Sequence, residues 1–148
     1  MEIKTPQPLK AEHDELHAQL AKAAKSGGRT GEAAMTVAKL MHPHFLKEEE
    51  YALPPLGILQ DLANDNIKPE MKQVLTMTEK LKRELPEMLI EHKQIVKALQ
   101  QLIKVAKEEN QPELEAFAEK LMLHAKTEEE VSYPAAILIG EYLKLKLV

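Results

Sequence analysis

The chain contains no cysteine. This absence excludes disulfides, thiolate-ligated metal sites, iron–sulfur clusters and a cysteine nucleophile. Tryptophan is also missing, and aromatic residues make up only 3% of the sequence. Strands favour aromatic and β-branched side chains, whereas this chain is rich in Ala, Leu, Lys, Glu, Gln and Met. The composition therefore favours helix.

Basic charge and long apolar runs are also lacking. The net charge is −4 and the pI is about 5.9, which is unfavourable for a protein whose main partner is nucleic acid. No apolar run approaches the length of a membrane span, and the first ten residues lack the core of a signal peptide. We therefore expect one cytoplasmic domain over residues 1–148, with neither a membrane nor a nucleic acid as partner.

Proline and glycine divide the sequence into helical stretches. Long helices are predicted over about 9–25 and 30–51, from Pro69 to Glu109, and from residues 110–112 to about 131. Shorter pieces are predicted over 56–62 and 135–145. Pro86 predicts a kink or break inside the third long helix, and Pro134 predicts the end of the fourth, because proline removes a helical hydrogen bond. These elements predict an all-α fold.

The two halves of the chain resemble each other. Residues 44–50 (HFLKEEE) resemble 124–130 (HAKTEEE), and a proline follows each histidine by ten positions. The Glu-His pairs at 12–13 and 91–92 are each followed by apolar residues at helical spacing. The two histidines of each half are 31 and 32 positions apart. Two helix pairs related by duplication predict a four-helix bundle with approximate two-fold symmetry.

Histidines and glutamates occupy apolar faces of the predicted helices. Residues four apart in a helix lie on one face, so His44 and Glu48 point the same way, as do His124 and Glu128. Both pairs continue a stripe of apolar residues and are therefore expected in the core. The apolar stripe of each long helix includes one histidine: His13, His44, His92 and His124.

Buried carboxylates are stable only with a compensating charge. Four imidazoles and two carboxylates facing one core suit Fe, Mn or Zn rather than Mg or Ca. Two ions, each held by histidines from two helices and both bridged by Glu48 and Glu128, would use all six side chains. Some coordination positions would remain open for solvent or a small ligand.

Other polar residues near this set are interpreted differently. His17, one turn after His13, is either an additional ligand or a residue at the edge of the site. His42 points away from the site and is interpreted as structural. Tyr51 and Tyr133 could donate hydrogen bonds near the ends of the pocket, although packing is the preferred interpretation. Four glutamates rotate off the ligand face and are expected in solvent: Glu49, Glu50, Glu129 and Glu130.

The order of these residues resembles the hemerythrin-like HHE cation-binding domains. The resemblance is carried by His13, His44-xxx-Glu48, His92 and His124-xxx-Glu128. It implies an up-down four-helix bundle, with short extra helices here, around a di-iron centre with a bridging oxo or hydroxo group. Family roles include reversible O2 binding, O2 or NO sensing, iron handling and help in repairing damaged iron centres.

The pattern is closer to bacterial HHE domains than to the invertebrate oxygen carriers. Val96 stands where the carriers have a second histidine on the third helix. The carriers also place an aspartate five residues after the last histidine, where this chain offers Glu128 at four. Simple O2 carriage is therefore less expected unless His17 supplies the missing imidazole.

Three functional hypotheses follow. The preferred one is a binding protein whose dimetal centre binds or senses O2, NO or peroxide, or handles iron. The first alternative is an enzyme, either a di-iron oxidase or peroxidase or an iron-centre repair protein, although the cysteine-bearing segment of the repair members is missing. The second is a structural bundle with zinc or no metal. Binding is preferred because no general base stands apart from the ligands. A protein partner is not indicated.

Overall fold

The computed structural model describes residues 2–147. Within this range the chain forms helices and no strand, which confirms the all-α prediction. The α-helices are α1 (Gln7–Ala24), α2 (Gly28–Lys47), α3 (Leu59–Ala63), α4 (Lys72–Glu108), α5 (Pro112–Thr127) and α6 (Tyr133–Lys146). Between them lie the π-helical segments η1 (Glu48–Ala52) and η4 (Glu128–Ser132) and the 3₁₀ segments η2 (Pro54–Ile58) and η3 (Pro69–Met71).

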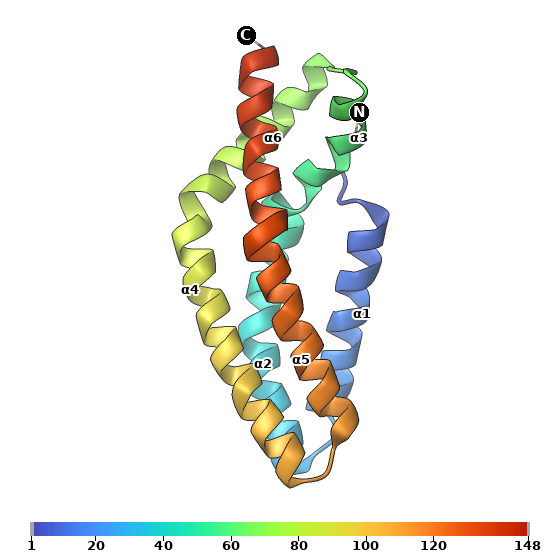
Figure 1. Ribbon diagram of the computed structural model, residues 1–148, viewed down its shortest axis with the longest axis vertical. Coiled ribbons are helices and arrows are strands. Elements are labelled where there is room, and N and C mark those ends of the chain that lie inside the picture. The colour runs from blue at the N-terminus through green and yellow to red at the C-terminus, as the bar shows by residue number, and fades with distance from the viewer. Residues whose placement is uncertain (1, 148) are drawn as a thin grey trace.

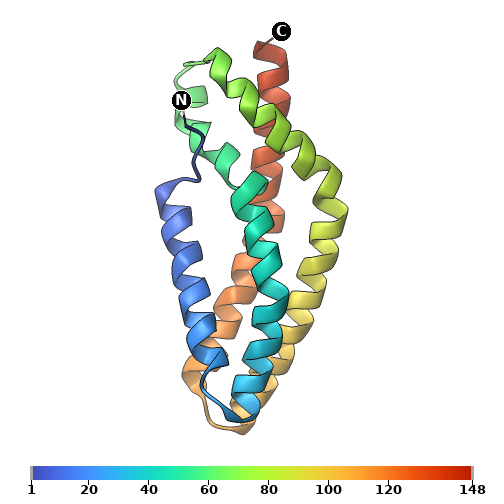
Figure 2. The ribbon, with the colours of Figure 1, turned by 180° about the vertical axis from the view of Figure 1, so that it is seen from behind.

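Four long helices make the bundle. Figures 1 and 2 show α1, α2, α5 and the C-terminal part of α4 running side by side in alternating directions. Helix α2 packs against α1 and α4, and α4 packs against α5. The N-terminal part of α4 extends beyond the bundle and packs against α6. This is the predicted four-helix bundle with short additional helices. In the part of the chain that the structure describes, no helix has the length and apolarity to cross a membrane.

Helix α4 continues through its internal proline. Pro86 lies inside the 37-residue helix, and the ribbon is visibly bent (Figure 2). A proline removes one backbone hydrogen bond and crowds the preceding turn, which is a common cause of such a bend. Of the two predicted alternatives, a kink or a break, the structure therefore shows the kink.

The expectation that Pro134 ends the fourth helix is wrong. Helix α5, η4 and α6 follow one another as a single rod (Figure 1), and both Ser132 and Tyr133 have right-handed helical backbone angles. Pro134 stands in the first turn of α6, directly after the π-helical turn. A π-helical turn replaces the hydrogen bonds between residues four apart by bonds between residues five apart. A proline that follows it, which has no N–H to donate, therefore does not interrupt the rod. In the first half, by contrast, the chain turns away into η2 after η1.

Two apolar cores lie along the bundle axis. One core lies towards the α1–α2 and α4–α5 connections and includes Leu20, Val37, Leu99 and Leu121. The other lies towards α6 and includes Leu56, Leu81, Met88, Tyr133 and Leu143. In each long helix the predicted metal-ligating histidine falls between residues of these two cores. A buried polar layer therefore separates them.

Candidate metal centre

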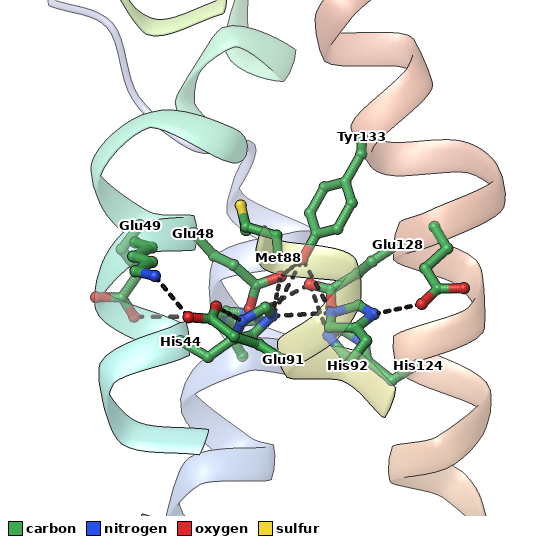
Figure 3. Close-up of polar contacts among 12 residues, drawn as sticks. His44, Glu48, Glu49, Met88, Glu91, His92, His124, Glu128 and Tyr133 are labelled. Carbon is green, nitrogen blue, oxygen red and sulfur yellow. Dashed lines mark hydrogen bonds and ion pairs between the residues drawn. The ribbon is translucent and has the colours of Figure 1, made fainter. Parts of the chain in front are cut away.

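All six predicted ligands meet in this polar layer, and Figure 3 labels five of them: His44, Glu48, His92, His124 and Glu128. Each long helix contributes its histidine, and the first residue of each π-helical segment is a glutamate of the site. His124 is the most accessible of the six, with a side chain 11% exposed. The other five are at most 3% exposed: His13, His44, Glu48, His92 and Glu128. The sequence-based assignment of the core face is thus reproduced for every one of them.

The first group of donors comprises His44, Glu48, His92 and Glu128, whose donor atoms all lie within 4.8 Å of one another. The Nε2 atoms of His44 and His92 are 2.8 Å apart. His92 Nε2 lies 3.4 Å from Glu128 Oε1, and His44 Nε2 lies 3.7 Å from Glu48 Oε2. Two imidazoles and two carboxylates therefore converge on one small volume.

The second group comprises His13, His124 and Glu128. Glu128 Oε2 lies 3.6 Å from His13 Nε2 and 3.3 Å from His124 Nε2. The remaining oxygen of Glu48, Oε1, lies 3.3 Å from His13 Nε2. Glu48 and Glu128 therefore each direct one oxygen to the first group and the other to the second, as carboxylates that bridge two cations would.

Several inward atoms of this site lack hydrogen-bond partners. Four buried polar atoms of the described chain are unpaired: His13 Nε2, Glu48 Oε1, His124 Nε2 and Glu128 Oε2. Buried polar atoms are rarely left unpaired, because each such atom costs about 1–3 kcal/mol. All four belong to the predicted ligand set and face its interior. Metal ions bound to these atoms would satisfy them, so the residues present fit a metal centre.

Charges within the site are strongly coupled. Burial and the charge of Glu128 raise the pKa of Glu48 well above its usual range. Burial acts the same way on Glu128, but the neighbouring carboxyl of Glu48 and the surrounding imidazoles hold its pKa well below the usual range. Burial opposes charge on His13, yet these two carboxylates raise its pKa to about 10. Without a metal, the site therefore holds protons in place of cations.

A second layer of glutamates faces the other ring nitrogen of each histidine. Each of these glutamates comes from a different helical segment than the histidine that it contacts. The distances from Nδ1 to the carboxylate are 2.8 Å for His44–Glu91, 3.1 Å for His92–Glu129, 2.5 Å for His124–Glu12 and 3.8 Å for His13–Glu49. The three shorter contacts are hydrogen bonds, which fix the ring orientation and tautomer of metal-ligating histidines. The 3.8 Å between His13 and Glu49 is a longer electrostatic contact.

Sequence reasoning did not foresee this layer. Glu49 and Glu129 are exposed, as expected, with side chains 39% and 38% accessible. Their carboxylates nevertheless face His13 and His92 respectively. The sequence did contain a signal for these two contacts. Glu49 follows Glu48 and Glu129 follows Glu128, and the next residue along a helix can reach a histidine on the neighbouring helix. Glu91 is held in addition by the Lys47 ammonium at 2.6 Å.

The remaining histidines lie outside the donor groups. His17 is exposed, and its ring centre lies 5.3 Å from that of Phe45 and 5.8 Å from that of His42. His42 is likewise exposed. The structure thus places His17 at the surface between α1 and α2, and does not bring it together with the six ligands.

Tyr133 is the residue that sequence reasoning undervalued. It is fully buried, and its hydroxyl donates a hydrogen bond to Glu48 Oε2 at 2.6 Å. At about 100° per residue, a position five after Glu128 would lie on roughly the opposite side of the helix. The intervening π-helical segment changes this register and directs Tyr133 towards the ligands. Periodicity alone contained no signal for it.

Fold and site together define a metal-binding four-helix bundle. The family model for the hemerythrin HHE cation binding domain matches residues 6–136, and the chain belongs to this family. No curated protein and no solved structure matched the chain. The resemblance recognised in the sequence is therefore confirmed at the level of the family, and cation binding is the property that the family and the buried cluster share.

Proposed function

We propose that this protein holds two non-haem iron ions and binds a small ligand at them, either a diatomic molecule such as O2 or NO, or peroxide. The observation that carries the proposal is the division of six donors into two groups that share Glu128 and are both approached by Glu48. Two cations between bridging carboxylates would cancel the negative charge buried there.

The donor set supports iron. Imidazole and carboxylate ligands together suit Fe, Mn and Zn, and the family roles of this domain centre on iron. Each ion would receive two imidazoles: His44 and His92 in one group, His13 and His124 in the other. Six-coordinate ions would need more donors than these six side chains provide. Positions therefore remain for an oxo or hydroxo bridge and for an exogenous ligand.

Binding rather than turnover is proposed because the titratable groups in the buried layer are the ligands themselves. Iron supplies the redox and Lewis-acid chemistry when it is bound. The chain supplies the dry, histidine-rich pocket, and the outer glutamates fix the imidazoles. Among the described residues, the four outer glutamates do not stand apart as a general base, because Glu12, Glu49, Glu91 and Glu129 each face a histidine Nδ1.

Metal analysis and optical spectra test this proposal. Protein purified without added metal should contain close to two iron ions per chain, with near-ultraviolet bands that change when O2, NO or peroxide is added to the reduced form. Tightly bound zinc with no iron uptake would overturn the proposal in favour of a structural role. Rapid, repeated turnover of peroxide would overturn it in favour of a peroxidase.

A further inference from the structure

Tyr133 occupies an unusual place for a tyrosine that only fills space. Its hydroxyl contacts three residues of the first donor group (Figure 3). The oxygen lies 2.6 Å from Glu48 Oε2, 3.0 Å from His92 Nε2 and 3.2 Å from His44 Nε2. A buried phenol needs one partner to satisfy its O–H group. Here it meets three, and all three are metal-facing atoms.

The orientation of the two imidazoles supports this reading of the contacts. Glu91 and Glu129 engage the Nδ1 atoms of His44 and His92, which leaves the Nε2 atoms to face the metal. Those two Nε2 atoms are the ones that the Tyr133 oxygen approaches. The phenol therefore lies on the inner side of the imidazoles, where a bound cation would be.

The distances match those between neighbouring donors of one ion. Metal–nitrogen and metal–oxygen bonds of about 2.1 Å at right angles place adjacent donor atoms about 3 Å apart. The three contacts of the Tyr133 oxygen, at 2.6, 3.0 and 3.2 Å, lie close to that separation, and so does the 2.8 Å between the two Nε2 atoms. The hydroxyl thus occupies the corner of a coordination polyhedron that these donors already outline.

We propose that Tyr133 is a metal ligand: its phenolic oxygen binds the ion held by His44, Glu48, His92 and Glu128. This inference rests on the proposed metal centre and adds a donor to it. On binding, a metal–oxygen bond forms, the O–H bond breaks, and the proton leaves to solvent. Until a cation arrives the phenol keeps its proton, because burial and the two bridging glutamates raise the pKa of Tyr133.

The consequence is that the two ions differ. Glu128 is followed by Tyr133 five positions later, whereas Glu48 is followed at the same distance by Leu53. Near His13 the neighbouring ring is that of Phe45, at 4.6 Å between ring centres, which offers no donor atom. The ion held by His13 and His124 therefore has fewer protein donors. It is the position at which an exogenous ligand binds.

An optical experiment on the iron-loaded chain tests the assignment. Phenolate bound to ferric iron gives a charge-transfer band in the visible region, and the wild type should show one. The Tyr133→Phe variant should lose the band while retaining two iron ions per chain. Tyr51→Phe is the matched control, because Tyr51 is also buried, and its hydroxyl faces the Met88 sulfur at 3.6 Å instead of the ligands. This control should keep the band.

A second variant covers the case in which Tyr133→Phe fails to fold. The chain has three tyrosines, so Tyr51→Phe combined with Tyr142→Phe leaves Tyr133 alone. Resonance Raman spectra of this double variant should show phenolate vibrations that shift when ring-deuterated tyrosine is incorporated. Two bound irons without any phenolate signal would overturn the ligand assignment alone. A wild type that binds no metal would overturn the metal-centre proposal together with it.

Discussion

Glu12 hydrogen-bonds the Nδ1 of His124 on the opposite half of the bundle, although its neighbour in sequence, His13, is itself a proposed ligand. Glu91 behaves in the same way: it precedes His92 but contacts His44. In each Glu-His pair, the histidine is therefore a proposed ligand, and the glutamate orients a histidine on another helix. The duplicated dipeptide connects two helices at each occurrence.

The first prediction concerns this outer layer. Replacing Glu91 by Gln removes the charge that orients His44 and should weaken metal binding about 10–100-fold, the usual effect of losing such a contact. Glu129→Gln should act similarly through His92. Metal affinity is measured by competition with a chelator. The control is Glu130→Gln, at an exposed position next to Glu129. An equal loss of affinity in the control would contradict the orienting role.

The second prediction separates the two bridging glutamates. Both Glu48→Gln and Glu128→Gln should lose bound metal. In the metal-free protein, however, the two substitutions should have different effects on thermal stability. The pKa of Glu48 is raised, so its carboxyl is already neutral and a glutamine resembles it. The pKa of Glu128 is lowered, so the same change removes a buried negative charge that the surrounding imidazoles stabilise.

Thermal unfolding of the metal-free variants measures this difference. Glu128→Gln should lower the melting temperature clearly, and Glu48→Gln should leave it close to wild type or raise it. A larger loss for Glu48→Gln would show that the charge is distributed the other way between the two carboxyls. In the metal-loaded state both variants should melt below wild type, because neither retains the cations that satisfy the buried donors.

The third prediction is a pH dependence of metal loading. In the metal-free protein the pKa of His13 is raised to about 10, so this imidazole is protonated at neutral pH. A cation must displace its proton, and the raised pKa of Glu48 adds another. The apparent metal affinity should therefore rise with pH from 6 to 9, with proton release on binding. Calorimetric titrations in buffers of different ionisation enthalpy measure that release.

The raised pKa of His13 also affects the stability of the metal-free fold, which should fall with rising pH while metal affinity increases. A raised histidine pKa stabilises the metal-free fold fully below the unfolded value of 6.5, and this contribution is lost as the pH rises through about 10. Metal-free protein should accordingly lose His13-dependent stability on alkalinisation while its affinity for metal increases. In His13→Gln, both dependences should be reduced. If the variant kept the proton release of wild type, His13 would not be its source.

The fourth prediction concerns packing between α4 and α6. A methyl group at Gly140 would clash with the Oγ1 of Thr78 and would lie 2.6 Å from Thr78 Cβ. Gly140→Ala should therefore destabilise the protein by about 1–3 kcal/mol, the usual cost of overpacking. Gly31→Ala is the matched helical control, since its nearest contact would be 3.4 Å away. It should stabilise by about 0.4–1 kcal/mol by restricting the unfolded chain. Denaturant unfolding measures both.

Much of this structure could be predicted from the sequence because the relevant signals are local and repeated. Proline and glycine set the limits of the first three long helices to within a few residues, and the 3.6-residue period placed four histidines on the faces that lie in the core. Glu48 and Glu128 followed from the same period, since each lies one turn after a histidine. Duplication of the pattern then indicated that the faces meet.

The features that sequence reasoning missed depend on departures from regular helix. The π-helical segments begin at Glu48 and Glu128 themselves, so a constant step of 100° per residue no longer holds beyond them and did not direct Tyr133 towards the site. Tyr133 and the unbroken passage through Pro134 both follow from η4. The outer glutamates depend on contacts between helices, which a single helical period does not describe.

The position of the ligand layer between two apolar cores has a mechanical consequence. Each core is apolar throughout. In the metal-free protein, the polar layer between the cores should therefore be the least stable part of the bundle. Protons that substitute for cations there leave four donors unsatisfied, and the helical turns carrying the ligands should exchange their amide hydrogens faster than the turns on either side. Binding of metal would then hold the four helices together at this layer, between the two apolar cores.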